Sequence, residues 1–284
     1  MRKPEMTERG VALIAVLWLV AAMVLIITGV VQAVRGEARI AGWQRQALVA
    51  DTLADAAILL ALQSMQAQKS ELPKSIQVIP VQFEGQLREV SVRPLNGLID
   101  INNATVVLLA DLYRHAGAMN HDAAQALAQA TIQSRQTKDA KGRPQGFDAV
   151  EDLLRVPGLT YDLYAKIAAF VTADIRTGSG RVNPMAAPMG VLQVLTGGDV
   201  YRAAILAAKR DADPNLMDTS FLKPEQIEMA SSNSLQLQVR VGLPDGNSLQ
   251  KTWIVYWAHD PRSGLPWRVL CTQQSMRQSI QPVS

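Results

Sequence analysis

The strongest pattern in the chain is an apolar run near its N-terminus, GVALIAVLWLVAAMVLIITGVVQAV. No charged side chain occurs between Val11 and Val34. As a helix, this run would extend about 36 Å at 1.5 Å per residue, and the core of a bilayer is about 30 Å thick. We therefore predict a helix over residues 11–34 that crosses a membrane once.

The helical pattern continues beyond the apolar run. Small and apolar side chains recur there at spacings of three and four residues, which is the spacing of one helical face. The first strong helix breaker is Pro73, so the two parts predict one rod of roughly 55 residues. This face could pack on the protein's own domain or on neighbouring subunits, and a long helix can do both with different halves. Its residues are Ile40, Trp43, Ala47, Ala50, Ala54, Ala57 and Ala61.

Two pairs of alternating segments predict β-hairpins. Residues 76–93 alternate on either side of Glu84-Gly85, and residues 235–241 and 249–257 flank a Pro-Asp-Gly-Asn turn. Residues 267–271 are a candidate edge strand. The intervening chain has a helical pattern. We therefore predict an α+β fold, in which segments 35–97 and 226–284 form a long helix and an antiparallel sheet, and residues 98–225 form a large inserted α-helical domain.

The inserted domain contains a predicted helix–hairpin–helix of the SAM-like kind, from Phe147 to Thr172. Asp148 is expected to cap the first helix, and Thr160 the second helix, which carries Leu163, Ile167 and Phe170. A Pro-Gly pair breaks the chain between them. The residues assigned to this hairpin are Leu153, Leu154, Val156, Pro157 and Gly158.

Composition and charge exclude several classes of function. The 284 residues carry a formal net charge of +3 without a basic cluster, so we predict no nucleic-acid partner. The single cysteine, Cys271, cannot form an intrachain disulfide, and with three separated histidines it makes no metal-binding pattern. The sequence shows no nucleophile–base arrangement, paired catalytic carboxylates or glycine-rich phosphate loop. We therefore predict no catalysis, cofactor or metal.

The charged N-terminal segment MRKPEMTERG runs directly into the apolar helix. This junction resembles a type IV prepilin leader, which a dedicated prepilin peptidase cuts after the glycine. The resemblance implies cleavage between Gly10 and Val11. It also implies a protein held in the inner membrane by a single pass, with its C-terminal domain in the periplasm.

Over nearly its full length, the chain resembles the minor pseudopilin K family of type II secretion systems. The leader, the helical insertion and the hairpin carry this resemblance. Residues 181–195 are also similar to the family's Asn-x-Asn-x-Ala-Pro segment, through Asn183, Ala187 and Pro188, with Met185 replacing the second asparagine. The resemblance implies a non-enzymatic subunit that caps the pseudopilus tip, helps to initiate its assembly and binds minor pseudopilins of the I and J types. It leaves open whether the helical domain contacts the secretin or a secreted substrate.

Two departures from the family patterns matter. Ala15 occupies the fifth position after the cleavage site, where most pilin-like subunits carry a glutamate thought to neutralise the amine of the preceding subunit. Its loss is consistent with a position at the tip. The family's acidic, calcium-associated segment is replaced by AQATIQSRQTKDAKG, which offers only Asp139. Calcium needs six to eight oxygen ligands, so we predict no metal there.

Two alternatives remain at this level. A minor pilin of a type IV pilus or DNA-uptake system would share the leader and the head. A membrane-anchored helix–hairpin–helix protein could bind DNA, although Thr160 replaces the last glycine of the usual Pro-Gly-x-Gly turn. Several acidic residues around that turn would also repel phosphate, namely Asp148, Glu151, Asp152 and Asp162.

Overall fold

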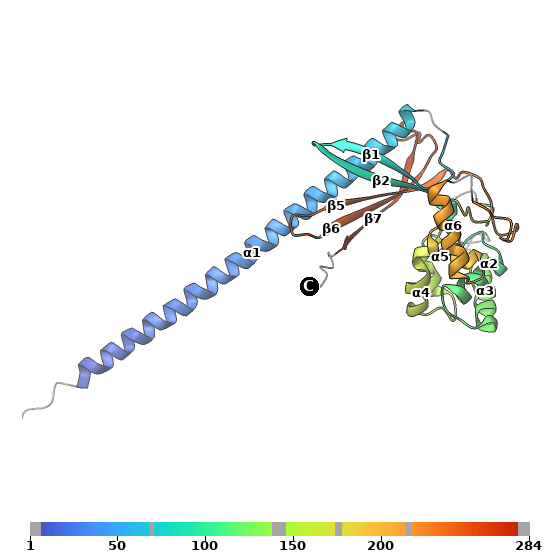
Figure 1. Cartoon of the computed structure of the whole chain (residues 1–284). Helices are drawn as coiled ribbons and strands as arrows, with labels where there is room; N and C mark the ends of the chain where they lie inside the picture. Colours follow the sequence, from blue (N-terminus) through green and yellow to red (C-terminus); the bar gives the residue numbers. More distant parts are fainter. Residues whose placement is uncertain (1–6, 69–70, 138–145, 174–177, 214–216, 278–284) are drawn as a thin grey trace, which may run out of the picture.

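A computed structural model of the chain describes residues 7–68, 71–137, 146–173, 178–213 and 217–277. Its longest element is helix α1 (Thr7–Ala67), which has 61 residues. Figure 1 shows α1 extending far out of the head as a continuous rod. The predicted long N-terminal helix is confirmed, and it begins within the charged leader, four residues before Val11.

The head is built on a five-stranded antiparallel sheet with the strand order β1-β2-β5-β6-β7. Both predicted hairpins are present. Glu84 and Gly85 have positive φ angles of 51° and 72°, as a two-residue type I′ turn requires. The strands are β1 (Gln77–Phe83), β2 (Gln86–Pro94), β5 (Ser234–Gly242), β6 (Ser248–Tyr256) and β7 (Arg268–Arg277).

The last strand corrects the sequence analysis, which ended it at Cys271. The strand β7 continues to Arg277 and pairs with β6 as far as Ser248. Its second half, TQQSMR, is exposed throughout. A strand with solvent on both faces shows no alternation of polar and apolar residues, so its pattern resembles a loop.

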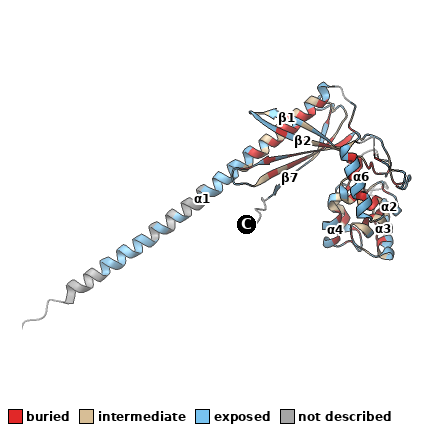
Figure 2. Ribbon diagram, viewed as in Figure 1, coloured by how far each residue is buried: buried red, intermediate tan, exposed pale blue. Residues whose placement is uncertain are grey.

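The C-terminal half of α1 covers one face of the sheet and forms the first core with it. Alternate residues of β5, including Leu235, Leu237 and Val239, point toward α1 and are at most 1% exposed. They meet a face of α1 on which alanine predominates, and such small side chains allow the helix to lie close to the strands. Figure 2 shows that burial on α1 is confined to the part that lies over the sheet.

A polar cluster fixes the position of α1 on this sheet. The Lys251 ammonium on β6 lies 2.6 Å from Asp51 Oδ1 and 3.2 Å from Asp55 Oδ1, both on α1. Trp253 Nε1 donates a hydrogen bond to Asp55 Oδ1 at 3.0 Å. Because these side chains must meet for Lys251 to be buried with a partner, the cluster selects one register of the helix over the sheet. We call these four residues the Lys251 cluster.

A helical block is inserted between β2 and β5 and has a second core of its own. In Figure 1 it lies at the end of the sheet opposite to the projecting half of α1. Two short strands, β3 (Ile99–Asp100) and β4 (Val171–Thr172), pair in parallel inside it. Its α-helices are α2 (Val106–His115), α3 (His121–Gln136), α4 (Tyr161–Ile167), α5 (Met189–Leu195) and α6 (Val200–Ala212), and its 3-10 helices are η1 (Leu95–Gly97), η2 (Val150–Arg155) and η3 (Ala168–Phe170).

The predicted helical hairpin is present with three corrections. Its first element, η2, is a 3-10 helix, and Asp148 does not cap it. The Asp152 carboxylate instead accepts hydrogen bonds from the backbone N–H groups of Asp148 and Ala149, at 2.9 and 3.1 Å. Thr160 caps α4 as predicted, because its Oγ1 accepts from the Leu163 N–H at 3.3 Å. Phe170 belongs to η3 and not to the second α-helix.

Candidate partner-binding surface

The described side chains from Val16 to Leu25 of α1 form an exposed apolar surface. From Val16 to Leu25, the large apolar side chains are between 53% and 74% exposed, and Trp18 is 72% exposed. Burying one side chain of this size is favourable by about 1.5–3 kcal/mol. A helix of this composition is therefore stable only when lipid or other helices cover it.

This apolar helix near the N-terminus is suited to a single membrane span. Among the described residues, the stretch Arg39–Ala67 meets the length and hydropathy of a span, and Ala15–Leu25 is a shorter apolar helix. Much of Arg39–Ala67 is already buried on the sheet, with Ala54 and Ile58 at 0% exposure. The core helix of a folded head explains that stretch, so the N-terminal apolar residues are the better candidate for the span.

The predicted partner face of α1 divides at Ala50. On its N-terminal side, Ile40 and Trp43 are 59% and 48% exposed, and Ala47 is half-buried. From there on, the sheet of the same chain covers the face. A partner role therefore does not hold for Ala50, Ala54 and Ala57, which are 3%, 0% and 0% exposed. The residues that remain available are Ala15, Ile40, Trp43 and Ala47.

A groove of about 550 Å³ runs beside this exposed part of α1. Gly42, Val49 and Leu53 form its helical side, and the turns of the two hairpins form the other side. Arg88 also lines the groove, and its guanidinium donates to the Phe83 carbonyl at 2.9 Å and to Gln86 Oε1 at 3.0 Å. We refer to the exposed face from Ile40 to Val49, together with this groove, as the α1 surface.

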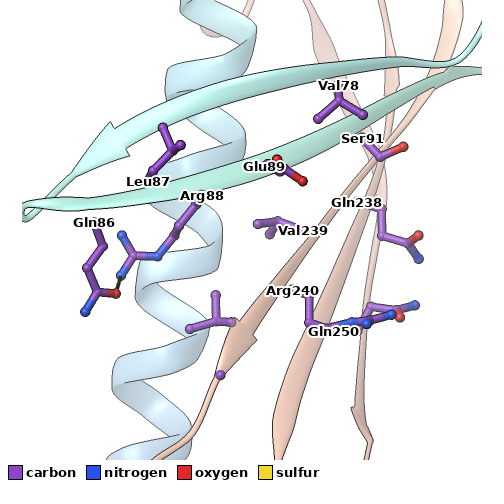
Figure 3. Close-up of a pocket in the computed structure, with 12 residues that line it drawn as sticks. Val78, Gln86, Leu87, Arg88, Glu89, Ser91, Gln238, Val239, Arg240 and Gln250 are labelled. Carbon is purple, nitrogen blue, oxygen red and sulfur yellow. Dashed lines mark hydrogen bonds between the residues drawn. The ribbon is translucent and has the colours of Figure 1, made fainter.

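A second hollow, of about 640 Å³, lies on the sheet itself (Figure 3). Its lining is mixed and includes Glu89, Ser91, Gln238, Arg240 and Gln250. No histidine or cysteine lines it, and Glu89 is its one carboxylate. This arrangement lacks the paired groups that acid–base or nucleophilic catalysis requires.

The helical hairpin serves mainly as structure. Leu153 and Val156 are 0% and 2% exposed and belong to the core of the helical block, and Leu154 packs against it. Pro157 and Gly158 form the exposed turn, where Gly158 has a φ of 91°. The basic group of η2, Arg155, is paired with Asp152 at 3.1 Å. The turn is thus flanked by acidic side chains, and the charge of Arg155 is paired with Asp152.

Some predicted residues fall outside what the structure describes. Gly10 and Val11 lie in the backbone of α1, but their side chains are not described, and neither are residues 1–6 of the leader. The segment that contains Asp139 also lies outside the described residues. Within the described ranges, no group of three or more histidine, cysteine, aspartate or glutamate side chains is placed to hold a metal ion.

The sequence analysis did not find the Lys251 cluster. Asp51 and Asp55 are polar residues outside the apolar face of the helix, and they reach Lys251 and Trp253 on β6. One signal was present in the sequence, because the two aspartates are four residues apart and therefore lie on the same side of α1. Their partner is 196 positions or more away in the chain, and no local pattern identifies it.

Comparison with known proteins gives one structural likeness. No protein-family model matches the chain, and no curated protein matches it. A chain in the crystal structure of the GspK-GspI-GspJ complex from the Type 2 Secretion System of enterotoxigenic Escherichia coli is similar, with a TM-score of 0.47 and 16% sequence identity. The match covers 82% of this chain and 96% of that one. A likeness of this level does not establish a family or a function for the chain.

Proposed function

We propose that this chain is a non-enzymatic, pseudopilin-like subunit that caps the tip of a type II secretion pseudopilus and helps to initiate its assembly. It would thereby serve the export of folded proteins across the outer membrane. The observation that carries the proposal is that α1 extends out of a head that has its own core, and that its described apolar side chains from Val16 to Leu25 are exposed. Lipid would cover this helix before assembly, and neighbouring helices would cover it afterwards.

The position in the cell follows from the same helix. Residues 11–34 would cross the inner membrane once, with the C-terminal head in the periplasm. Residues 1–10 would be removed by prepilin peptidase, which leaves Val11 as the mature N-terminus. In functional terms, residues 35–97 and 226–284 form the pilin-like head, and residues 98–225 form the inserted helical domain.

Two features support the tip position over a position along the shaft. Ala15 offers no carboxylate to neutralise the terminal amine of a neighbour, and an unpaired charge buried in a filament is costly. The helical block between β2 and β5 adds a second folded unit beside the sheet. A shaft in which every subunit carried such a block would have to separate its helices.

The proposed partners are two other minor pseudopilins, of the I and J types, that pack on the α1 surface. Trp43 and Ile40 would be the principal apolar contacts, because both are large and exposed. The helical block, at the far end of the head, would face away from the shaft. It would be free to contact the secretin or a secreted substrate.

Processing of the leader tests the class of protein directly. We expect mass spectrometry to find Val11 as the N-terminal residue in cells that contain prepilin peptidase. A Gly10→Leu variant should retain the leader, because the peptidase requires the small residue before the cut. A matched Gly36→Leu variant, on the far side of the apolar run, should be processed normally. A wild-type chain that still begins at Met1 would contradict the proposal.

The alternatives receive less support. A minor pilin of a type IV pilus or DNA-uptake system would share α1 and the sheet, but the size of the helical block favours the secretion system. A DNA-binding role for the hairpin conflicts with the acidic groups around its turn and the pairing of Arg155 with Asp152.

A further inference from the structure

The strand β7 forms one border of the five-stranded sheet, and part of this border is unprotected. Among the described strands, β7 pairs only with β6, so its outer side carries backbone N–H and C=O groups that no strand of the sheet meets. From Thr272 to Arg277 the strand is exposed, and its register with β6 is continuous. The opposite border, β1, contains Pro80, a residue that discourages further pairing. We call residues 272–277 the open edge.

A cleft of about 500 Å³ lies beside the start of the open edge. It is bounded by the helical block and by the face of the sheet that points away from α1, from Gln236 of β5 to Gln273 of β7. Its apolar walls include Leu98, Val150 and Leu270. Because Gln273 belongs both to this lining and to the open edge, a strand added to β7 would direct the side chain opposite Gln273 toward the cleft. We call it the edge cleft.

The two ends of this path carry charges of opposite sign. Asp148 and Glu151 line the edge cleft, and Arg277 ends the open edge. No ion pair between described residues includes any of the three. Arg277 and Gln273 are four positions apart in a strand, so their side chains lie on the same face of the sheet. A segment paired with the open edge is therefore favoured by an acidic residue opposite Arg277 and by an uncharged one at the edge cleft.

A second copy of this chain does not meet these requirements. Antiparallel pairing of the whole of β7 with β7 of another molecule would place Arg277 opposite Arg268 and Gln273 opposite Thr272. The two arginines would repel each other, and threonine offers no large apolar side chain to the edge cleft. The charges and the cleft therefore fit a different protein.

We propose that β7 accepts an extended segment of another protein as an additional antiparallel strand. The segment carries an acidic residue opposite Arg277 and, four positions later in its own sequence, a large apolar residue opposite Gln273. Main-chain hydrogen bonds supply affinity in this mode of recognition, and the edge cleft supplies specificity. The open edge is separate from the α1 surface, and the inference does not depend on a position at the pseudopilus tip.

The test uses the full chain in detergent micelles and a fluorescent hexapeptide with blocked ends. The peptide has glutamate first, phenylalanine fifth and threonine elsewhere, and empty micelles give the background. Fluorescence anisotropy should show saturable binding. Alanine in place of phenylalanine should weaken binding by about tenfold or more, because burial of an aromatic side chain is lost. Lysine in place of glutamate should weaken it by about fivefold, because an attractive cross-strand pair becomes a repulsive one.

Two N-methylated peptides distinguish strand addition from other modes of binding. Successive residues of an added edge strand direct their N–H groups alternately to β7 and to solvent. Methylation of the nitrogens of the odd-numbered residues and of the even-numbered residues should therefore differ in effect. One set should abolish binding, and the other should leave it nearly unchanged. Equal effects of the two sets would overturn the proposal.

Variants of the chain test the two side-chain contacts. Arg277→Glu should reverse the preference between the glutamate and lysine peptides. Ala169→Phe fills the edge cleft from an exposed position on η3, and should remove the advantage of the phenylalanine peptide over the alanine peptide. Arg114→Glu, a matched charge change on an exposed residue of α2 outside the edge cleft, should alter neither preference.

The oligomeric state of the chain tests the alternative occupant. Analytical ultracentrifugation should show that the peptide does not change the size of the protein in micelles. A dimer that the peptide dissociates would mean that a second copy occupies the open edge, which would overturn the proposal. Absence of saturable peptide binding to the wild type would overturn it as well.

Discussion

Trp43 and Ala54 lie on the same face of α1, eleven positions apart, and differ in what covers them. Trp43 is 48% exposed, whereas Ala54 is 0% exposed beneath the sheet. Trp43→Arg should therefore weaken the proposed complex with two other minor pseudopilins without changing the stability of the head. Ala54→Arg should lower the free energy of unfolding by about 3 kcal/mol or more, through overpacking and a buried charge.

Co-purification of the partners and chemical denaturation measure these two effects separately. Each variant serves as the control for the other, because both introduce the same side chain on the same helical face. A Trp43→Arg protein that unfolds early, or that retains its partners at wild-type level, would argue against the assignment of the α1 surface.

The Lys251 cluster gives a prediction about stability and pH. Burial disfavours the charge of Lys251, but the hydrogen bonds and Coulomb attraction of Asp51 and Asp55 outweigh it, so the pKa of Lys251 is raised above 10.5. A raised lysine pKa stabilises the folded state fully below the unfolded pKa, and the contribution is lost as the pH rises through the folded pKa. Lys251→Met should cost about 1–2 kcal/mol at pH 8, since the two aspartates stay partly hydrated.

Denaturation at pH 8 and above pH 11 tests this. The difference between wild type and Lys251→Met should shrink at the higher pH. Lys74→Met is the matched control, because Lys74 pairs with Glu71 at the surface, where both side chains are more than 60% exposed, and its loss should have no measurable effect. Equal costs for the two lysine variants would show that the cluster does not hold α1.

At this scale, the sequence predicted which residues form the helix face but not which of them the sheet covers. The alternating spacing of Ala47, Ala50 and Ala54 is the same on both sides of the boundary. Whether an alanine of this face is buried depends on where the sheet ends. The position of that edge is determined by strands almost 200 positions away in the chain. The cap of η2 was mispredicted for a similar reason. Asp148 lies just before η2 and Asp152 lies in its first turn, and the backbone geometry decides which of the two carboxylates accepts from the free N–H groups.

The helical hairpin provides a prediction for one element. Gly158 forms its turn with a φ of 91°, a conformation that side chains rarely adopt. Gly158→Ala should destabilise the helical block by about 1–2 kcal/mol, because of backbone strain. Gly42→Ala is the control, since Gly42 lies inside α1 with open space around it, and should be neutral or stabilising. Thermal unfolding of both variants makes the comparison, and a stable Gly158→Ala protein would show that the turn can rearrange.

Elements with a strong local signal could be predicted from the sequence, whereas elements held by tertiary contacts could not. The long helix and both hairpins follow from apolar period, breakers and turn residues. The parallel pair β3 and β4 has two residues in each strand, too few to give a period. The sequence could not distinguish the 3-10 form of η2 from a short α-helix, because either type of helix would bury Leu153 on the same side.

The described part of the molecule has two cores, and the core of the helical block extends onto the sheet through Ile254 of β6, with Leu270 and Cys271 of β7 packed against it. The apolar part of α1 lies on the side away from the helical block. The insertion was predicted because strands precede and follow a long helical region. Its placement at the far end of the sheet needed the structure. That placement leaves the α1 surface open to partners on one side and the helical block open on the other.

The central claim is that this subunit occupies the tip of a pseudopilus. The most direct measurement is electron microscopy of assembled filaments, with a gold label on an epitope placed in the C-terminal segment after Arg277. The account predicts label at one end of each filament and none along the shaft. Label at regular intervals along the shaft would contradict it.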